Sequence, residues 1–305
     1  MNQNKKGLLL ALVMAVISGV VVFISKFGVS VVNPYIFTAL KNIVVAMVVV
    51  SWLLMMKDWR ILKELKKSQW IILSAIGLIG GSIPFLLYFK GLSLTIPVRA
   101  AFIHKSMFIY VSFLAAIFLK EKINRKLLAG GLLLFLGNLL LLKSFPYQIG
   151  WGDLLILTAT LFWAVENTMS KHLIKSLPPR IVIWGRMFFG SILIVLFLLI
   201  TGQANLMLAL DVRQIGWTMI TSTFLFVALA AWYTSLKYIK VSIAATVLLL
   251  ASPITTLLSL IFLGEVLMTA QIIGMLLIIL TVVLGCYFRR HFLFGYDEKK
   301  PVFSR

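Results

Sequence analysis

Residues 25–41 read SKFGVSVVNPYIFTALK, and residues 170–186 read SKHLIKSLPPRIVIWGR. Both stretches follow one pattern: a Ser-Lys pair, seven residues, a proline, six residues and a basic residue. The first copy begins at Ser25 and the second at Ser170, a shift of 145 positions. A spaced pattern that recurs at a fixed distance indicates an internal duplication. The sequence therefore predicts a chain made of two related halves.

Other residues obey the same repeat. The shift of 145 also pairs Gln69 with Gln214 and Tyr88 with Tyr233. A later block, F-L-x-E-x8-G, occurs at residues 118–130 and recurs at 262–274, after a shift of 144. One residue has been lost between the two blocks. We place the first half at 7–143 and the second at 151–287, followed by a tail at 288–305.

The composition identifies the environment of these halves. Of the 305 residues, 61% are hydrophobic and 12% are charged, and apolar stretches of about 20 residues predict membrane-spanning helices. The expected spans, numbered 1 to 10, are 7–29, 34–56, 68–90, 97–119, 126–143, 151–173, 180–200, 214–237, 241–263 and 268–288. The links are too short for a soluble domain. The predicted fold class is an all-α integral membrane protein with ten transmembrane helices.

Five spans in each half set the relation between the halves. An odd number of spans makes the second half enter the membrane from the opposite side, which gives two inverted five-helix repeats. This architecture is characteristic of secondary transporters, with the substrate site near the midplane between the halves. The alternative is a duplication that only builds a stable bundle.

The net charge of +20 is distributed unevenly along the chain. Most Lys and Arg residues fall at the termini or in the links of one side, whereas Lys90, Arg99, Lys143 and Arg213 fall on the other. Cytoplasmic links carry such an excess of positive charge. We therefore predict a multi-pass protein with both termini cytoplasmic and a basic cytoplasmic tail at 288–305. The charge indicates topology and attraction to the lipid bilayer, and no nucleic-acid partner is expected.

Three segments carry a resemblance to a known family. They are AAFIHKSMFIYVSFLAAIFLKEKINRKLLAGG (100–131), DLLILTATLFWAVENTMSKHL (153–173) and ASPITTLLSLIFLGEVLMTAQIIGMLLI (251–278). The chain resembles the paired EamA modules of the drug/metabolite transporter superfamily over nearly its whole length. The resemblance implies a ten-span carrier for small metabolites, amino acids among them, often an exporter. It also implies that spans 3, 4, 8 and 9 surround a central cavity and that spans 1, 2, 6 and 7 gate it.

Span 4 departs from that family pattern. Met107 and Phe108 stand where span 9 has Ser252 and Pro253. We therefore expect span 4 to lack the break that Pro253 gives to span 9. His104 and Lys105 are added in the same region. We expect this departure from the family pattern to affect the choice of substrate more than the fold.

Two charges of opposite sign lie near the middle of their predicted spans. Glu166 has Val21 at its matching position in the first half, and Lys105 is matched by Leu249 or Leu250. A lone charge in hydrocarbon costs about 2.5–3.5 kcal/mol on insertion scales, and a paired charge costs less. We expect Glu166 to face the central cavity and to pair with Lys105. The pair is either structural or one that a zwitterionic substrate interrupts.

Further residues complete the predicted substrate site. Asn167 and Trp163 share one helical stripe of span 6. Tyr88 and Tyr233 are repeat mates that could line an aromatic cavity, although membrane aromatics also serve in packing. His104 could serve in packing, or could couple transport to protons as Glu166 could.

Lys41 and Arg186 are repeat mates that lie seven residues past their prolines. That spacing places them roughly 10 Å into the membrane at about 1.5 Å per residue. We predict that they are gate cations, Lys41 toward the outside and Arg186 toward the cytoplasm. The alternative is that both side chains snorkel to the headgroups.

Other classes of protein fit less well. Residues 150–153 (GWGD) and Tyr296–Asp297 spell the two motifs of an intramembrane aspartyl protease, but in the reverse order, with Asp153 at a position that caps a helix. The sequence contains no phosphate-binding loop of the G-x-x-x-x-G-K-[ST] type. Its three His and one Cys show no metal-ligand spacing. We expect no enzyme activity, no metal and no cofactor.

The sequence predicts a secondary transporter in the cytoplasmic membrane of a prokaryote, working by alternating access. Its expected cargo is a small polar metabolite, an amino acid or a related organic acid, moved by export. The alternative is an exporter of cationic or amphipathic compounds with Glu166 as the cation or proton site. A non-transporting receptor or scaffold is the remaining class. The expected state is a monomer or weak dimer.

Overall fold

The computed structural model describes residues 3–122, 124–142 and 149–287. In these ranges every regular element is a helix. The first half contains α1 (Gln3–Val31), α2 (Pro34–Met55), α3 (Trp59–Lys63), α4 (Lys67–Ile76), η1 (Gly77–Ser82), α5 (Ile83–Ser93), α6 (Pro97–Lys105), α7 (Met107–Phe118) and α8 (Arg125–Leu140). The second contains α9 (Trp151–Ile174), α10 (Pro179–Ile200), η2 (Ala204–Met207), α11 (Val212–Tyr238), α12 (Val241–Val247), η3 (Leu248–Leu250), α13 (Ala251–Leu263) and α14 (Thr269–Tyr287). The predicted tail at 288–305 lies outside the described residues.

Local signals explain where several helices begin and end. Asn33 accepts a hydrogen bond from the backbone N–H of Tyr35, and Pro34 occupies the first turn of α2. Asp211 and Gln214 form a capping box at the start of α11. Gly264 ends α13 with φ 64°, a left-handed conformation that glycine adopts without strain.

Seven helical segments in the described ranges are long and apolar enough to cross a membrane. They are Gln3–Val31, Pro34–Met55, Lys67–Ser93, Pro97–Phe118, Pro179–Ile200, Val212–Tyr238 and Val241–Leu263. Two shorter apolar helices are Leu127–Leu140 and Thr269–Val282. The long helix α9 is outside this set and carries Asp153, Glu166 and Lys171. The chain is thus an all-helical, multi-pass membrane protein.

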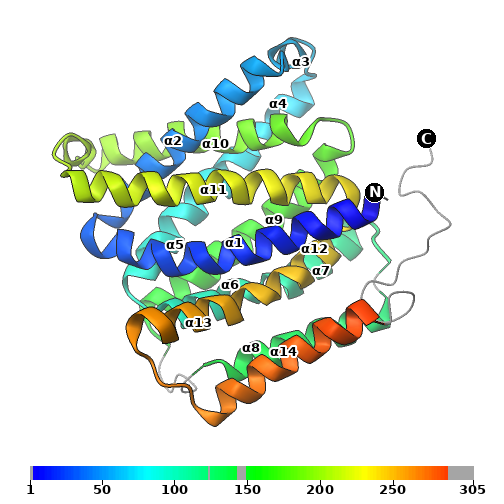
Figure 1. The fold of residues 1–305 in the computed structure, drawn as a ribbon. Coiled ribbons are helices and arrows are strands. Elements are labelled where there is room, and N and C mark those ends of the chain that lie inside the picture. Colours follow the sequence, from blue (N-terminus) through cyan, green and yellow to red (C-terminus); the bar gives the residue numbers. More distant parts are fainter. Residues whose placement is uncertain (1–2, 123, 143–148, 288–305) are drawn as a thin grey trace.

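Helices of one half pack against helices of the other in reciprocal pairs. Span 1 (α1) packs on span 8 (α11), and its repeat mate, span 6 (α9), packs on span 3 (α5). Spans 2 and 7 (α2 and α10) pack on each other, as do spans 5 and 10 (α8 and α14), which form a separate pair at one edge of the bundle (Figure 1). The core therefore lies between the halves.

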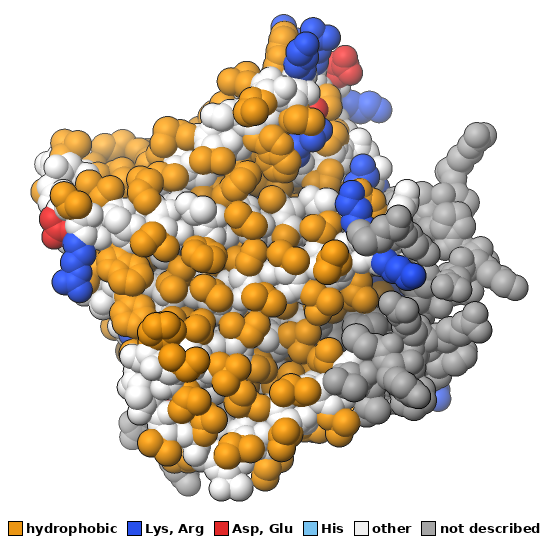
Figure 2. Space-filling model, viewed as in Figure 1, with side chains coloured by type: hydrophobic (Ala, Val, Ile, Leu, Met, Phe, Trp, Pro, Cys, Tyr) orange, Lys and Arg blue, Asp and Glu red, His pale blue; other side chains and the backbone are white. Residues whose placement is uncertain are grey.

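The outer surface is apolar. In Figure 2 hydrophobic side chains cover most of the visible face, and Lys and Arg gather mainly at the end where α1 begins and around α3. Large side chains such as Phe113, Phe262 and Leu276 are more than half exposed on this surface. Such a surface is stable against lipid.

The prediction that span 4 is unbroken is wrong. Helix α6 ends at Lys105 and α7 begins at Met107. At Ser106 the backbone N–H is shared between the carbonyls of Phe102 and Ile103, and the hydroxyl also donates to the Ile103 carbonyl at 2.7 Å. A serine hydroxyl competes for backbone hydrogen bonds in this way, so this break needs no proline. The matching break in span 9 is η3, between α12 and α13.

Candidate functional site

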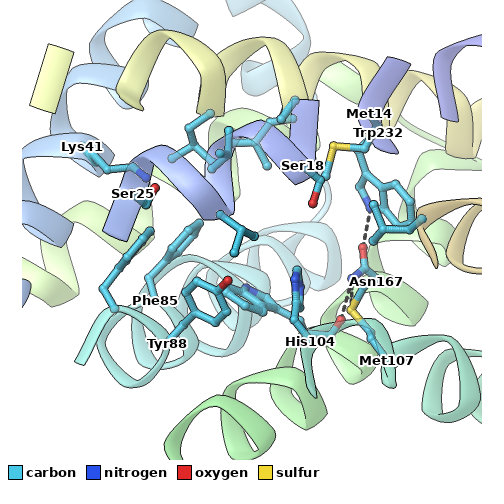
Figure 3. A pocket seen from close by; sticks show the side chains of 18 of the residues that line it. Met14, Ser18, Ser25, Lys41, Phe85, Tyr88, His104, Met107, Asn167 and Trp232 are labelled. Atoms are coloured by element: carbon cyan, nitrogen blue, oxygen red, sulfur yellow. Dashed lines mark hydrogen bonds between the residues drawn. The ribbon is translucent and has the colours of Figure 1, made fainter. Parts of the chain in front are cut away.

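A pocket of about 100 Å³ with a mostly apolar lining lies between the two halves. A single water needs roughly 10–15 Å³ measured this way, so the pocket holds a group of several atoms. Figure 3 shows side chains entering it from α1, α2, α5 and the α6–α7 region as well as from the second half. Six residues named from the sequence line it: Lys41, Tyr88, His104, Trp163, Asn167 and Arg186.

Glu166 pairs with Arg186, and the predicted pair with Lys105 is wrong. Arg186 Nη1 lies 3.6 Å from Glu166 Oε2. Glu166 Oε1 accepts hydrogen bonds of 2.5 Å from the hydroxyls of Ser170 and Tyr233. Glu166 is fully buried and is not among the residues that line the pocket, whereas Arg186 is. The carboxylate therefore anchors Arg186 at the pocket wall.

The physical reason for that pairing is the close approach of span 3. At Gly80, in the π-helical segment η1, a Cβ atom would lie 2.1 Å from Glu166 Cγ. The Gly80 carbonyl accepts hydrogen bonds from Arg186 Nε (3.2 Å) and Trp163 Nε1 (3.0 Å). Arg186 Nη1 also donates to the Tyr233 hydroxyl at 2.7 Å. These contacts fix the guanidinium beside Glu166.

Lys105 has a different environment. Its Nζ donates to Ser18 Oγ at 2.8 Å and lies 3.5 Å from His104 Nδ1. Lys105 is buried, and its partner Ser18 lines the pocket, as His104 does. Within the described residues we find no ion pair to Lys105. It contributes positive charge close behind one wall.

Aromatic rings form a continuous wall of the pocket. The ring of Tyr88 lies 5.4 Å from His104 and 5.2 Å from Trp163, and His104 lies 5.0 Å from Trp163. At the other side Trp232 Nε1 donates to Asn167 Oδ1 at 2.5 Å, the contact drawn in Figure 3. The amide of Asn167 also donates to the Trp163 carbonyl at 2.7 Å. These hydrogen bonds link Trp232, Asn167 and Trp163 on this side of the pocket.

The two predicted gate cations are both buried. Lys41 is 0% exposed and Arg186 is 5% exposed, so snorkelling to headgroups is wrong for both. Lys41 Nζ lies 4.2 Å from the ring centre of Phe89 and 5.0 Å from that of Phe37. In contrast to Arg186, its ammonium has no hydrogen-bond partner in the described part of the chain.

Helix α1 contributes a face of the pocket that was not predicted from the sequence. Met14, Ser18, Val21 and Ser25 line the pocket from this helix, and Ser25 Oγ is buried without a partner. The spacing of these four residues could have predicted this, because they recur at helical intervals and so lie on one face of span 1. Within the opposite wall, Trp232 lines the pocket, while its neighbour Tyr233 contacts Glu166 and Arg186 behind it.

Other acidic residues have structural partners. Asp153 accepts from the Gly150 backbone N–H at 3.0 Å and pairs with Arg99 at 3.2 Å, as a helix cap would. Glu121 accepts from the backbone and hydroxyl of Ser242 and from the Val241 N–H. The described residues contain no cluster of three His, Cys, Asp or Glu that could hold a metal. The partner motif at Tyr296–Asp297 lies outside the described residues.

Comparison with known proteins assigns the family. The model of the EamA-like transporter family matches residues 5–143 and 150–285. The chain belongs to the EamA-like transporter family. The two matched blocks coincide closely with the halves expected from the repeat, and the assignment agrees with the drug/metabolite transporter superfamily named from the sequence.

Two relatives of this EamA-like transporter are named uncharacterized transporters. The transporter YyaM of Bacillus subtilis (strain 168) is 27% identical over 72% of this chain and 75% of its own length. An uncharacterized transporter of Archaeoglobus fulgidus is 24% identical over 67% of this chain and 70% of its own. A crystal structure aligns with a TM-score of 0.72 at 17% identity, covering 94% of this chain and 97% of the other. That likeness concerns the fold alone.

Proposed function

We propose that this EamA-like protein is a secondary transporter that moves a small carboxylate-bearing metabolite, an amino acid or a related organic acid, by alternating access. The proposed direction is export across the cell membrane. The pocket between the halves is the proposed substrate site, because carriers built from inverted repeats bind their cargo at the repeat interface.

The charge of the pocket carries this proposal. Lys41, His104 and Arg186 line it, and the buried Lys105 lies directly behind Ser18. No Asp or Glu is found among the described residues that line the pocket. A site with basic side chains and aromatic walls favours an anionic group on a small, partly apolar body.

The cation-exporter alternative is supported less well. It needs Glu166 as an open cation site, but the Glu166 carboxylate already contacts Arg186, Tyr233 and Ser170. A cation would have to compete with a buried guanidinium. We therefore keep the anion-bearing substrate as the proposed class.

Alternating access needs the inverted ten-span topology, which we retain as part of the proposal. The seven long spans, α9 and the two shorter apolar helices add up to the ten segments expected. The reciprocal pairing of spans 1 with 8 and 6 with 3 supports a two-fold relation between the halves. In this scheme Lys41 and Arg186 act as gate cations on opposite faces, and His104 and Glu166 are the candidates for proton coupling.

A ligand-induced thermal-shift screen of the purified protein tests the substrate class. Ligand that binds the folded state raises the melting temperature by mass action. We expect amino acids or organic acids to raise it and amines of the same size to leave it unchanged. Amines that stabilise the protein while every carboxylate fails would contradict the proposed class and restore the cation alternative. Flux of each stabilising compound through reconstituted vesicles then tests transport itself.

A further inference from the structure

The internal repeat gives the pocket a second copy of the Glu166 environment. In the second half Arg186, Tyr233 and Ser170 all contact the Glu166 carboxylate. Their repeat mates, 145 positions earlier, are Lys41, Tyr88 and Ser25. The first half thus has the same three kinds of donor: a cation, a phenol and a serine hydroxyl.

The fourth member differs between the halves. The residue that matches Glu166 is Val21, which has no carboxylate. Val21 lines the pocket together with Lys41, Tyr88 and Ser25. A valine side chain ends at its Cγ atoms, so it lacks the Cδ and the two carboxylate oxygens through which a glutamate accepts hydrogen bonds. The first half therefore has the donors of a carboxylate site and lacks the carboxylate.

The three donors are unsatisfied. Lys41 Nζ, Tyr88 Oη and Ser25 Oγ are buried, and none has a hydrogen-bond partner within the described residues. In Figure 3 the side chains of Lys41 and Ser25 enter the pocket from α2 and α1, and Tyr88 points into it from α5. Buried polar groups are nearly always paired, and an unpaired buried ammonium is costlier still. Three such groups around one pocket indicate a site completed by an anion.

We propose that Lys41, Tyr88 and Ser25 bind the carboxylate of the transported substrate, which takes the position that the Glu166 carboxylate holds in the second half. This inference rests on the proposed function and names the part of the pocket that recognises the substrate. Lys41 supplies the charge, and the two hydroxyls donate hydrogen bonds to the carboxylate oxygens. The rings of Phe85, Phe89 and Trp163, which also line the pocket, then pack against the substrate's apolar part.

The decisive variant builds the missing carboxylate into the chain. Val21→Glu should place a carboxylate among the three donors, as Glu166 does, and Val21→Gln is its uncharged control of the same size. We expect Val21→Glu to melt several degrees above Val21→Gln while Lys41 is present. In a Lys41→Met background the order should reverse, because the new carboxylate is then unpaired. A Val21→Glu variant that is no more stable than Val21→Gln while Lys41 is present, or that keeps its advantage in the Lys41→Met background, would overturn the site.

Ligand binding gives a second, independent measurement on the wild-type chain. The probes are L-alanine, L-leucine, L-phenylalanine, L-lactate and phenylacetate, each beside its amide. At least one acid should raise the melting temperature while its amide does not, and Lys41→Met and Val21→Glu should lose that response. Tyr88→Phe should weaken the affinity for the acid about tenfold or more, the size expected for a lost hydrogen bond to a charge. Tyr110→Phe, outside the pocket lining, is the matched control and should bind as the wild type does.

The outcomes separate this site from the carrier proposal. An acid response that survives Lys41→Met, or no response to any acid, overturns the carboxylate site. If acids bind through Lys41 but reconstituted vesicles do not move them, the carrier proposal fails and the site stands. If reconstituted vesicles move only uncharged or cationic compounds, and Val21→Glu does not change that flux, the carrier proposal stands and the carboxylate site is overturned.

Discussion

Glu166 illustrates how a single charge is accommodated inside the membrane-like part of the chain. Its Oε1 accepts hydrogen bonds from Tyr233 and Ser170, and its Oε2 forms an ion pair with Arg186 at 3.6 Å. Burying a charge is tolerable when an opposite charge lies beside it and hydrogen bonds add to the pairing. The same three donor types without a carboxylate, at Lys41, Tyr88 and Ser25, leave a charge for a ligand to neutralise.

A double-mutant cycle tests the partner of Glu166. Glu166→Gln and Arg186→Met should each destabilise the protein by about 3–5 kcal/mol, because each leaves one buried charge unpaired. The double variant should recover part of that loss, with a coupling of about 1–3 kcal/mol. Thermal melting in detergent provides the measurement.

The control cycle uses the pair expected from the sequence. The substitutions are Glu166→Gln and Lys105→Met. In the structure Glu166 and Lys105 contact different partners. Their effects should add to within about 0.5 kcal/mol. Strong coupling to Lys105 together with additivity to Arg186 would show that the observed pairing is not the one formed in solution.

At the scale of elements, the irregular turns lie where polar side chains gather. The segment Lys67–Ser93 contains the π-helix η1, where the carbonyls of the buried Gly80 and Gly81 accept hydrogen bonds from side chains of other helices. Asn42 donates to the Gly81 carbonyl at 2.7 Å, and Arg186 and Trp163 donate to that of Gly80. Single-turn π-helices frequently occur at functional sites. Here the widened turn positions Arg186 on the pocket wall.

Adding a methyl group at Gly80 tests this element. In Gly80→Ala the Cβ would lie 2.1 Å from Glu166 Cγ, so α9 must shift. Overpacking of this kind costs about 1–3 kcal/mol, and transport should fall as Arg186 moves. Gly216→Ala, within α11 and with no atom within 4 Å of its Cβ, is the control. It should be neutral or stabilising by up to about 1 kcal/mol. Equal melting temperatures for the two variants would contradict the close approach.

At the scale of the molecule, matched lysines tie each half together in the same way. Lys26 Nζ donates to the Leu92 carbonyl at 2.9 Å and to the Thr95 carbonyl at 2.7 Å, at the end of α5. Its repeat mate Lys171 donates to the carbonyls of Leu236 and Ile239, at the end of α11. A cation is favourable at the C-terminus of a helix. The Ser-Lys motif that revealed the repeat is therefore a helix-end contact made once in each half.

Accessibility of two serines near the ends of spans 1 and 6 tests the inverted topology. Ser30 lies in the last turn of α1 and Ser176 lies just after the end of α9. Both are exposed, and each donates to the carbonyl three residues earlier. In a Cys286→Ser background, Ser30→Cys should react with an impermeant thiol reagent added outside cells. Ser176→Cys should react only after the cells are opened. Labelling of both from the same side would exclude an inverted repeat.

The sequence by itself determined the membrane class, the two halves and six of the side chains that line the pocket. Those features depend on composition and on spacing along the chain, and a charge such as Glu166 or Lys105 stands out in an apolar run wherever the helices lie. Only the tertiary structure decided which charges meet. The partner of Glu166 is Arg186 on the next helix, Lys105 bonds to Ser18, and Lys41 is left without a partner. The rotation and register of packed helices are set by side chains from several spans at once, such as Gly80 against Glu166. The periodicity of one helix fixes its faces but not the helix that each face contacts.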